Sequence, residues 1–171
     1  SPFAHAQAMD TAPRNAAILF ADVAGSTRLY ETAGDAAALT LIGRCLDVMR
    51  AVCEERDGRV VKTIGDEVMA VFPSAGNAGY ATIDMHGRIA RLGEGGVRLA
   101  IHAGFHCGPV LEDGADFYGD TVNVASRLCS LAKGGQTLMA AETLEHLPMP
   151  LKVRTRSQDV HAVRGKQADI E

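Results

Sequence analysis

The chain has 171 residues, of which 47% are hydrophobic, and its formal net charge is -4. This length and apolar content suit one compact domain, because domains of about this size bury roughly 70% of the surface that the unfolded chain exposes. The 17 basic and 21 acidic residues produce no global positive field, which argues against nucleic acid as a partner.

The cysteines carry neither a metal-binding nor a secreted disulfide pattern, since no two of them have Cys-x-x-Cys spacing. We interpret them as core thiols in a reducing, cytoplasmic compartment: Cys45, Cys53, Cys107 and Cys129. No run approaches the ~20 consecutive apolar residues of a membrane-spanning helix. We therefore expect no membrane segment in this sequence.

The first predicted element is a buried strand. Residues 1–15 are small and polar and contain Pro2 and Pro13, so we expect a linker or disordered arm there. The domain is predicted over 16–164, with 165–171 as a tail or the start of a linker. A continuous apolar run over 16–21 ends in Asp22, the pattern of a central strand that delivers a carboxylate at its end.

A turn of small residues and a long helix follow. Ser26 or Thr27 can cap a helix and leave backbone N–H groups free for phosphate, although an ordinary strand-to-helix connection has the same composition. Gly34 and Asp35 are suited to a C-cap and a new N-cap. Apolar residues then recur at helical spacing up to Asp57-Gly58: Leu39, Ile42, Leu46, Met49 and Cys53.

Residues 60–72 predict a β-hairpin, with two β-rich apolar runs meeting at Gly65-Asp66. Lys62 and Asp66 interrupt these runs, and burying either charge is costly without a partner such as a metal or a ligand. The alternative is a purely structural pair, a turn aspartate and a strand lysine at a sheet edge.

Residues 75–92 predict a second helix, and 97–105 another strand. His102 and His106 lack metal-ligand spacing, so we expect core or strand-end histidines. After a connection over 107–117, a helix over 122–132 carries Asn123 and Arg127 on one face. There they can address one ligand, or they can simply be two exposed polar residues.

The last third predicts a strand over 136–140, a short helix over 141–147, and strands near 151–156 and 159–163. Lys152, Arg154 and Arg156 on the first late strand form either a phosphate clamp or a solvated hairpin face. The element order predicts an α+β fold. It has a ferredoxin-like βαββαβ core, extra C-terminal strands and helices, and a largely antiparallel sheet with helices on one side.

Two strand-end carboxylates, Asp22 and Asp66, and a phosphate-binding turn indicate phosphoryl or nucleotidyl transfer. Two Mg²⁺ or Mn²⁺ ions can activate a hydroxyl and neutralise phosphate charge, and carboxylate oxygens are suitable ligands for them.

Three segments, 20–27, 62–66 and 116–127, resemble in order the motifs of the class III nucleotidyl cyclases, and the resemblance covers 16 to about 163. It implies intramolecular attack of the ribose 3′-oxygen of ATP on its α-phosphorus, giving 3′,5′-cyclic AMP and pyrophosphate. Asn123 would orient the ribose and Arg127 would stabilise the charge that develops at the α-phosphate. The metal-binding residues would be Asp22, Val23 and Asp66.

By the same resemblance, Lys62 and Asp116 would read the adenine edge. The remaining substrate-binding residues would be Gly25, Ser26, Thr27 and Arg154, with Arg156 and Lys152 as alternates for the triphosphate cation. Guanylate cyclases of the family usually carry Glu and a small polar residue at the two base-reading places, so this pair favours ATP.

The resemblance also implies a homodimer with two shared sites, and it leaves room for regulatory domains outside this sequence. Three alternatives remain: a guanylate or relaxed-specificity cyclase, a degenerate nucleotide-binding regulatory module without turnover, and a non-catalytic ferredoxin-like interaction domain. The last of these leaves the two strand-end aspartates unexplained.

Overall fold

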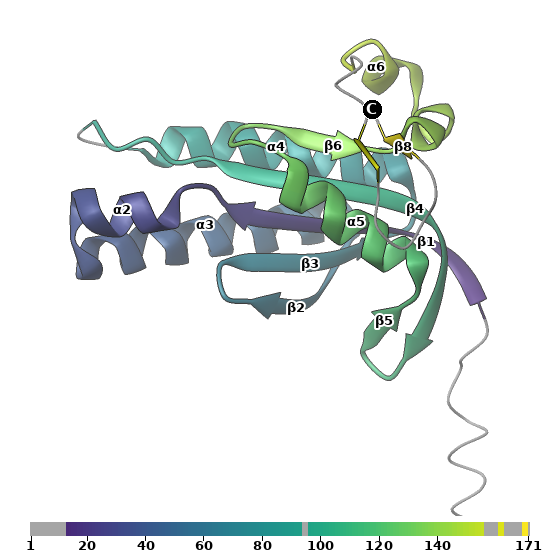
Figure 1. The fold of residues 1–171 in the computed structure, drawn as a ribbon, viewed down its shortest axis with the longest axis horizontal. Helices are drawn as coiled ribbons and strands as arrows, with labels where there is room; N and C mark the ends of the chain where they lie inside the picture. Colours follow the sequence, from purple (N-terminus) through teal and green to yellow (C-terminus); the bar gives the residue numbers. More distant parts are fainter. Residues whose placement is uncertain (1–12, 94–95, 156–160, 163–168, 171) are drawn as a thin grey trace, which may run out of the picture.

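The computed structural model describes residues 13–93, 96–155, 161–162 and 169–170. Figure 1 shows a sheet with helices on both faces. The elements in chain order are β1 (Pro13–Val23), α2 (Ser26–Ala33), α3 (Asp35–Glu55), β2 (Arg59–Ile64), β3 (Glu67–Phe72), α4 (Ala75–Leu92), β4 (Ile101–Asp113), β5 (Asp116–Tyr118), α5 (Asp120–Leu131), β6 (Thr137–Met139), the 3₁₀ helix η1 (Ala141–His146), α6 (Met149–Lys152), β7 (His161–Ala162) and β8 (Asp169–Ile170). None of these helices combines the length and apolar character needed to cross a membrane.

The main sheet has the strand order β2-β3-β1-β4-β5, and β6 pairs in parallel with β4. Every other pair in this sheet is antiparallel, and β1 lies at its centre between β3 and β4. β7 and β8 form a separate two-stranded pair. The ferredoxin-like βαββαβ core and the largely antiparallel sheet are therefore confirmed.

The middle of β1, residues 16–21, is apolar without interruption because both faces of this part of the strand are covered. Ala17, Leu19 and Ala21 belong to the core beneath α3 and α4, whereas Ile18 and Phe20 belong to a second cluster beneath α5. Alternate residues of a strand point to opposite faces, so each set has its own helical cover. The prediction that the helices lie on one side of the sheet is wrong, since α5 crosses the opposite face (Figure 1).

The long helix α3 forms where the apolar spacing predicts it, with one exception. Ile42, Met49 and Cys53 are buried, but Leu39 is 61% exposed. Leu39 follows the buried Ala38 by one residue, which rotates its side chain about 100° away from the buried stripe. The predicted N-cap Asp35 is the first helical residue instead, because Gly34 occupies the cap position.

β4 is longer than predicted and begins later. It starts at Ile101 and continues through the predicted connection to Asp113, because the start of β1 pairs with this stretch up to Pro13↔Leu111. For the same reason β1 begins at Pro13, inside the predicted arm of residues 1–15. The predicted strand near 151–156 is also wrong, since the helix α6 occupies Met149–Lys152. The predicted strand near 159–163 lies partly outside the described residues.

Candidate active site

Asp22 lies at the end of the central strand, on the face that α5 covers. Its register partners are Glu67 of β3 and His102 of β4, and its side chain is 30% exposed. The turn between β2 and β3 places Asp66 beside this strand end, and Gly65 supplies the left-handed backbone (φ 60°) of the turn. The structure thus brings the two predicted metal-binding aspartates to one end of the sheet.

The electrostatics of this end favour a bound cation. Burial raises the pKa of the Asp22 carboxyl, the neighbouring His102 lowers it, and the charge of Asp66 raises it again. Burial and the charge of Asp22 likewise raise the pKa of Glu67. A divalent cation between Asp22 and Asp66 would relieve the repulsion, and their hard oxygens fit Mg²⁺ or Mn²⁺.

Among the described residues, no three His, Cys, Asp or Glu side chains stand close enough to hold one ion. A metal at this end would therefore need further oxygen ligands from water or from a bound phosphate. Ions such as Mg²⁺ are commonly held in that way, through one or two carboxylates together with substrate phosphates.

The turn after Asp22 leads directly into a helix that has no side-chain cap. Gly25 occupies the N-cap position with φ 67°, and the Leu29 N–H donates to its carbonyl oxygen at 3.0 Å. Ser26 is the first helical residue, so the prediction that Ser26 or Thr27 caps this helix is wrong. The first backbone N–H groups of α2 therefore remain available to a bound anion.

Lys62 and Asp116 meet although β2 and β5 stand at opposite ends of the sheet order. The Lys62 Nζ atom lies 2.9 Å from Asp116 Oδ2, and the Phe117 N–H donates to Asp116 Oδ1 at 2.7 Å. The hydrogen bond from Lys62 lowers the pKa of Asp116, and the same bond raises the pKa of Lys62. Arg59 of β2 stacks over the Phe117 ring at 5.4 Å, so a second contact holds the two strands together.

Asn123 and Arg127 are exposed on α5, whose opposite side buries Val124, Leu128 and Cys129 against the sheet. Neither side chain has a hydrogen bond or ion pair to any other described residue. Because Asp22 lies on the sheet beneath α5, these two side chains point away from the Asp22 of their own chain. Within one chain, the structure does not bring them into one site with the aspartates.

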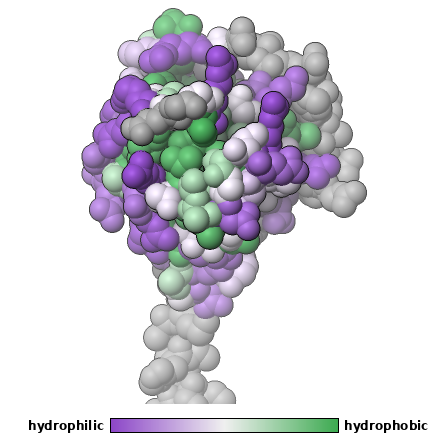
Figure 2. Space-filling view, turned by 90° about the vertical axis from the view of Figure 1, so that its left-hand side faces the viewer, coloured by the Kyte–Doolittle hydropathy of each residue, from purple (hydrophilic) through white to green (hydrophobic). Residues whose placement is uncertain are grey.

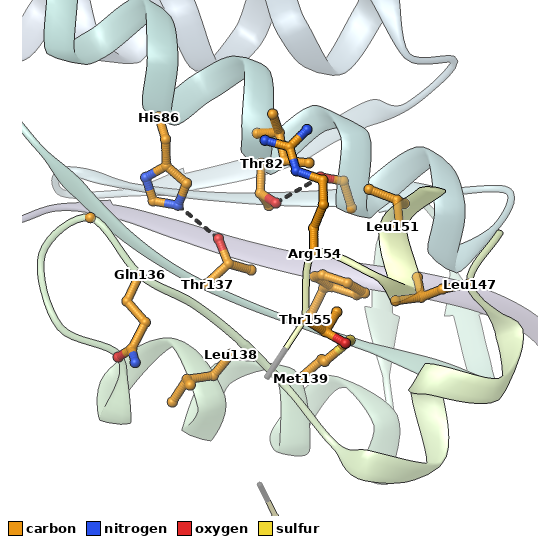
Figure 3. Close-up of a pocket in the computed structure, with 14 residues that line it drawn as sticks. Thr82, His86, Gln136, Thr137, Leu138, Met139, Leu147, Leu151, Arg154 and Thr155 are labelled. Carbon is orange, nitrogen blue, oxygen red and sulfur yellow. Dashed lines mark hydrogen bonds between the residues drawn. The ribbon is translucent and has the colours of Figure 1, made fainter. Parts of the chain in front are cut away.

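Arg154, the predicted triphosphate cation, lies in a turn after α6 at a cavity of about 340 Å³. Figure 3 shows its guanidinium near Thr82 of α4, with Leu151 and Thr137 also on the cavity wall. This cavity is on the α4 face of the sheet, opposite the face of Asp22. Lys152 is the last residue of α6, and Arg156 lies outside the described residues.

The close tie of His102 to the site is not visible in the sequence. His102 Nε2 lies 3.4 Å from Asp22 Oδ2, and its Nδ1 lies 2.6 Å from the Cys129 carbonyl oxygen of α5. Cys129 Sγ in turn donates to Glu67 Oε2 at 3.8 Å. The antiparallel register of β1 and β4 creates this cluster, and single-sequence spacing does not encode that register.

The apolar surroundings of the site are seen from its end of the molecule. Figure 2 shows that end, where α2 lies, with apolar atoms in the middle and hydrophilic residues around them. Two large exposed apolar side chains belong to elements that reach this end, Leu39 of α3 at 61% and Ile64 of β2 at 52%. Single exposed apolar side chains of this kind are common on protein surfaces and identify no partner by themselves.

A ferredoxin-like core with paired strand-end aspartates and a Lys–Asp pair is typical of the nucleotidyl cyclases. The family model of the adenylate and guanylate cyclase catalytic domain matches residues 9–170. The chain therefore belongs to this family, and the resemblance noted in the sequence is confirmed.

Relatives named as adenylate cyclases also match the chain. The germination-specific adenylate cyclase of Dictyostelium discoideum is 31% identical over 170 residues, covering 89% of this chain and 20% of that protein. The chain also spans only 33% of several mycobacterial relatives.

Two solved structures share the fold. An adenylate/guanylate cyclase/hydrolase from Silicibacter pomeroyi gives a TM-score of 0.75 at 23% identity, covering 93% of this chain and 94% of that one. The adenylyl cyclase CyaB from P. aeruginosa gives 0.72 at 22% identity, covering 93% and 92%.

Proposed function

We propose that this domain is a class III adenylate cyclase. It converts ATP to 3′,5′-cyclic AMP and pyrophosphate at two sites shared across a homodimer. The observation that carries the proposal is the Lys62–Asp116 pair, whose charged atoms lie 2.9 Å apart. Lys62 stands on the β2–β3 hairpin that also carries Asp66. The family includes guanylate cyclases, so the base must be decided by the residues that face it.

The Lys62–Asp116 pair matches adenine and mismatches guanine. A lysine donates to a ring nitrogen of adenine, and a carboxylate accepts from its exocyclic amine. The 6-oxygen and N1–H of guanine present the reverse polarity, which leaves both protein groups opposed by like partners. A site built from such groups rejects the wrong base because the bound base then leaves its polar atoms unpaired.

At the reacting end, Asp22, Asp66 and the main chain of Val23 would hold two Mg²⁺ or Mn²⁺ ions. When bound, these ions lower the pKa of the ribose 3′-hydroxyl and neutralise phosphate charge. The backbone N–H groups from Gly25 to Thr27 would receive phosphate oxygens. The 3′-oxygen forms a bond to the α-phosphorus, its proton leaves to solvent, and the bond to the pyrophosphate oxygen breaks.

Asn123 and Arg127 are proposed to act on the substrate that the partner's aspartates hold. The amide of Asn123 would orient the ribose, and the guanidinium fork of Arg127 would stabilise the charge on the α-phosphate. Their outward direction on α5 supports a second copy as the source of the facing half-site. A cation for the triphosphate would come from Arg154, Lys152 or Arg156.

The direct test is product formation by the purified domain with Mn²⁺ and ATP, measured by mass spectrometry of the nucleotides. Asp66→Asn is the matched control, because it removes the charge and keeps the shape of the turn. We expect cyclic AMP from the native chain and none from the variant. Tight nucleotide binding without product, at a protein concentration where dimers are demonstrated, would establish the regulatory module instead. Faster turnover of GTP would establish a guanylate cyclase.

A further inference from the structure

His102 is built into the metal-binding end of the sheet from two sides. It stands on β4 directly opposite Asp22 in the antiparallel register, and its side chain is only 20% exposed. One ring nitrogen faces the Asp22 carboxylate at 3.4 Å, and the other lies 2.6 Å from the Cys129 carbonyl oxygen. The ring is thus clamped between a predicted metal ligand and the main chain of α5.

The contact with Cys129 decides which nitrogen carries a hydrogen. A carbonyl oxygen only accepts, so Nδ1 must be the donor in this short contact. In the neutral imidazole, Nε2 then carries a lone pair, and this lone pair faces the Asp22 carboxylate. Nε2 therefore either carries a proton that it donates to the Asp22 carboxylate or offers its lone pair to a metal ion held beside Asp22.

The spacing between these two atoms fits two ligands of one metal ion. Adjacent nitrogen and oxygen ligands that each lie about 2.1 Å from an ion are roughly 3.0–3.4 Å apart in octahedral or tetrahedral geometry. The observed 3.4 Å falls in that range. Metal-binding histidines also commonly donate their second N–H to a backbone carbonyl, which fixes the tautomer and the ring orientation.

We propose that His102 Nε2 is a nitrogen ligand of one of the cations that Asp22 holds. This inference rests on the proposed function, because it assumes a metal at Asp22. The consequence is a metal preference. Imidazole binds Mn²⁺ and Zn²⁺ far better than Mg²⁺. A site with this nitrogen ligand therefore prefers Mn²⁺ or Zn²⁺ over Mg²⁺ more strongly than an all-oxygen site does. Water and nucleotide oxygens complete the coordination, since no third acidic, Cys or His side chain converges within the described part of the chain.

The test is pulsed electron paramagnetic resonance of Mn²⁺ bound to the protein with a non-hydrolysable ATP analogue. Histidine labelled with ¹⁵N separates the protein's imidazoles from the nitrogens of adenine. We expect a ¹⁴N modulation that changes to the ¹⁵N pattern on labelling. Bound Mn²⁺ with no labelling-sensitive signal would overturn the inference and leave the proposed function standing. Failure of Mn²⁺ to bind the nucleotide complex at all would overturn both.

A matched pair of variants gives a second readout. His102→Asn keeps an N–H near the position of Nδ1, for the Cys129 carbonyl, and removes Nε2. We expect it to weaken Mn²⁺ binding at least ~10-fold and Mg²⁺ binding less than ~2-fold. His146→Asn, at an exposed histidine of η1, is the control and should change neither. Equal losses for both ions in His102→Asn would show a merely structural role and contradict the proposal.

Discussion

Gly104→Ala tests whether the position of α5 on the sheet controls activity. Gly104 of β4 points at α5, and a Cβ atom added there would lie 2.3 Å from the Cys129 backbone nitrogen and 2.6 Å from the Leu128 carbonyl carbon. An ordinary contact begins at 3.4 Å, so the helix backbone must move by about 1 Å. No flexible side-chain end is available to absorb the clash.

The magnitude follows from that displacement. Overpacking of this kind costs about 1–3 kcal/mol, which lowers the melting temperature of a domain this size by roughly 2–12 °C. Because α5 carries Asn123 and Arg127, a 1 Å shift also misplaces the groups that we propose act on the substrate. Misplacement on that scale reduces kcat/KM by about 100-fold. We therefore expect a moderate loss of stability and a much larger loss of activity.

The assay combines thermal unfolding with initial rates of cyclic AMP formation. Gly43→Ala is the matched control, because the added Cβ meets nothing within 4 Å in the interior of α3. It should stabilise the domain by ~1 kcal/mol, as Gly→Ala does in helices, and leave the rate unchanged. A Gly104→Ala variant with native melting temperature and native kcat/KM would refute the reasoning about α5.

Two further predictions concern base choice and pH. The double variant Lys62→Glu with Asp116→Ser reverses the polarity of both base contacts, so we expect the ATP/GTP ratio of kcat/KM to fall about 100-fold, at roughly tenfold per contact. An unchanged ratio would remove this pair from base recognition. Burial lowers the pKa of His86, whose Nε2 bonds to Thr137 Oγ1 at 2.7 Å. The native chain should therefore lose stability as pH falls below 6.5, and His86→Gln should lose less between pH 7.5 and 5.5 in urea unfolding. Parallel losses in the two proteins would contradict the assignment to His86.

Much of the fold could be predicted because local pattern and tertiary environment agree. The uninterrupted apolar run before Asp22 reflects a central strand covered on both faces, and Gly65 marks the hairpin turn with its positive φ. The second half of β4 was missed for the opposite reason. Gly108 and Pro109 are typical of loops, but pairing with the start of β1 holds them in an extended strand.

Part of the site could also be predicted from the sequence, and part could not. Asp22 and Asp66 are recognisable because each is a charged residue at the end of an apolar run. The meeting of Lys62 with Asp116 came from the family resemblance, since the two residues sit at opposite ends of the strand order. The Asp22–His102 contact could not be predicted from spacing, because it depends on which residues face each other across two strands far apart in sequence.

Mixing two inactive variants tests the shared-site claim most directly. Asp22→Ala removes a proposed metal ligand and Asn123→Ala removes a group of the proposed facing half-site, so each homodimer should be inactive. After subunit exchange, half of the dimers carry one intact site of two, which predicts about one quarter of native activity. Exchange demonstrated by native mass spectrometry with no recovery of cyclic AMP formation would contradict a site shared across the dimer.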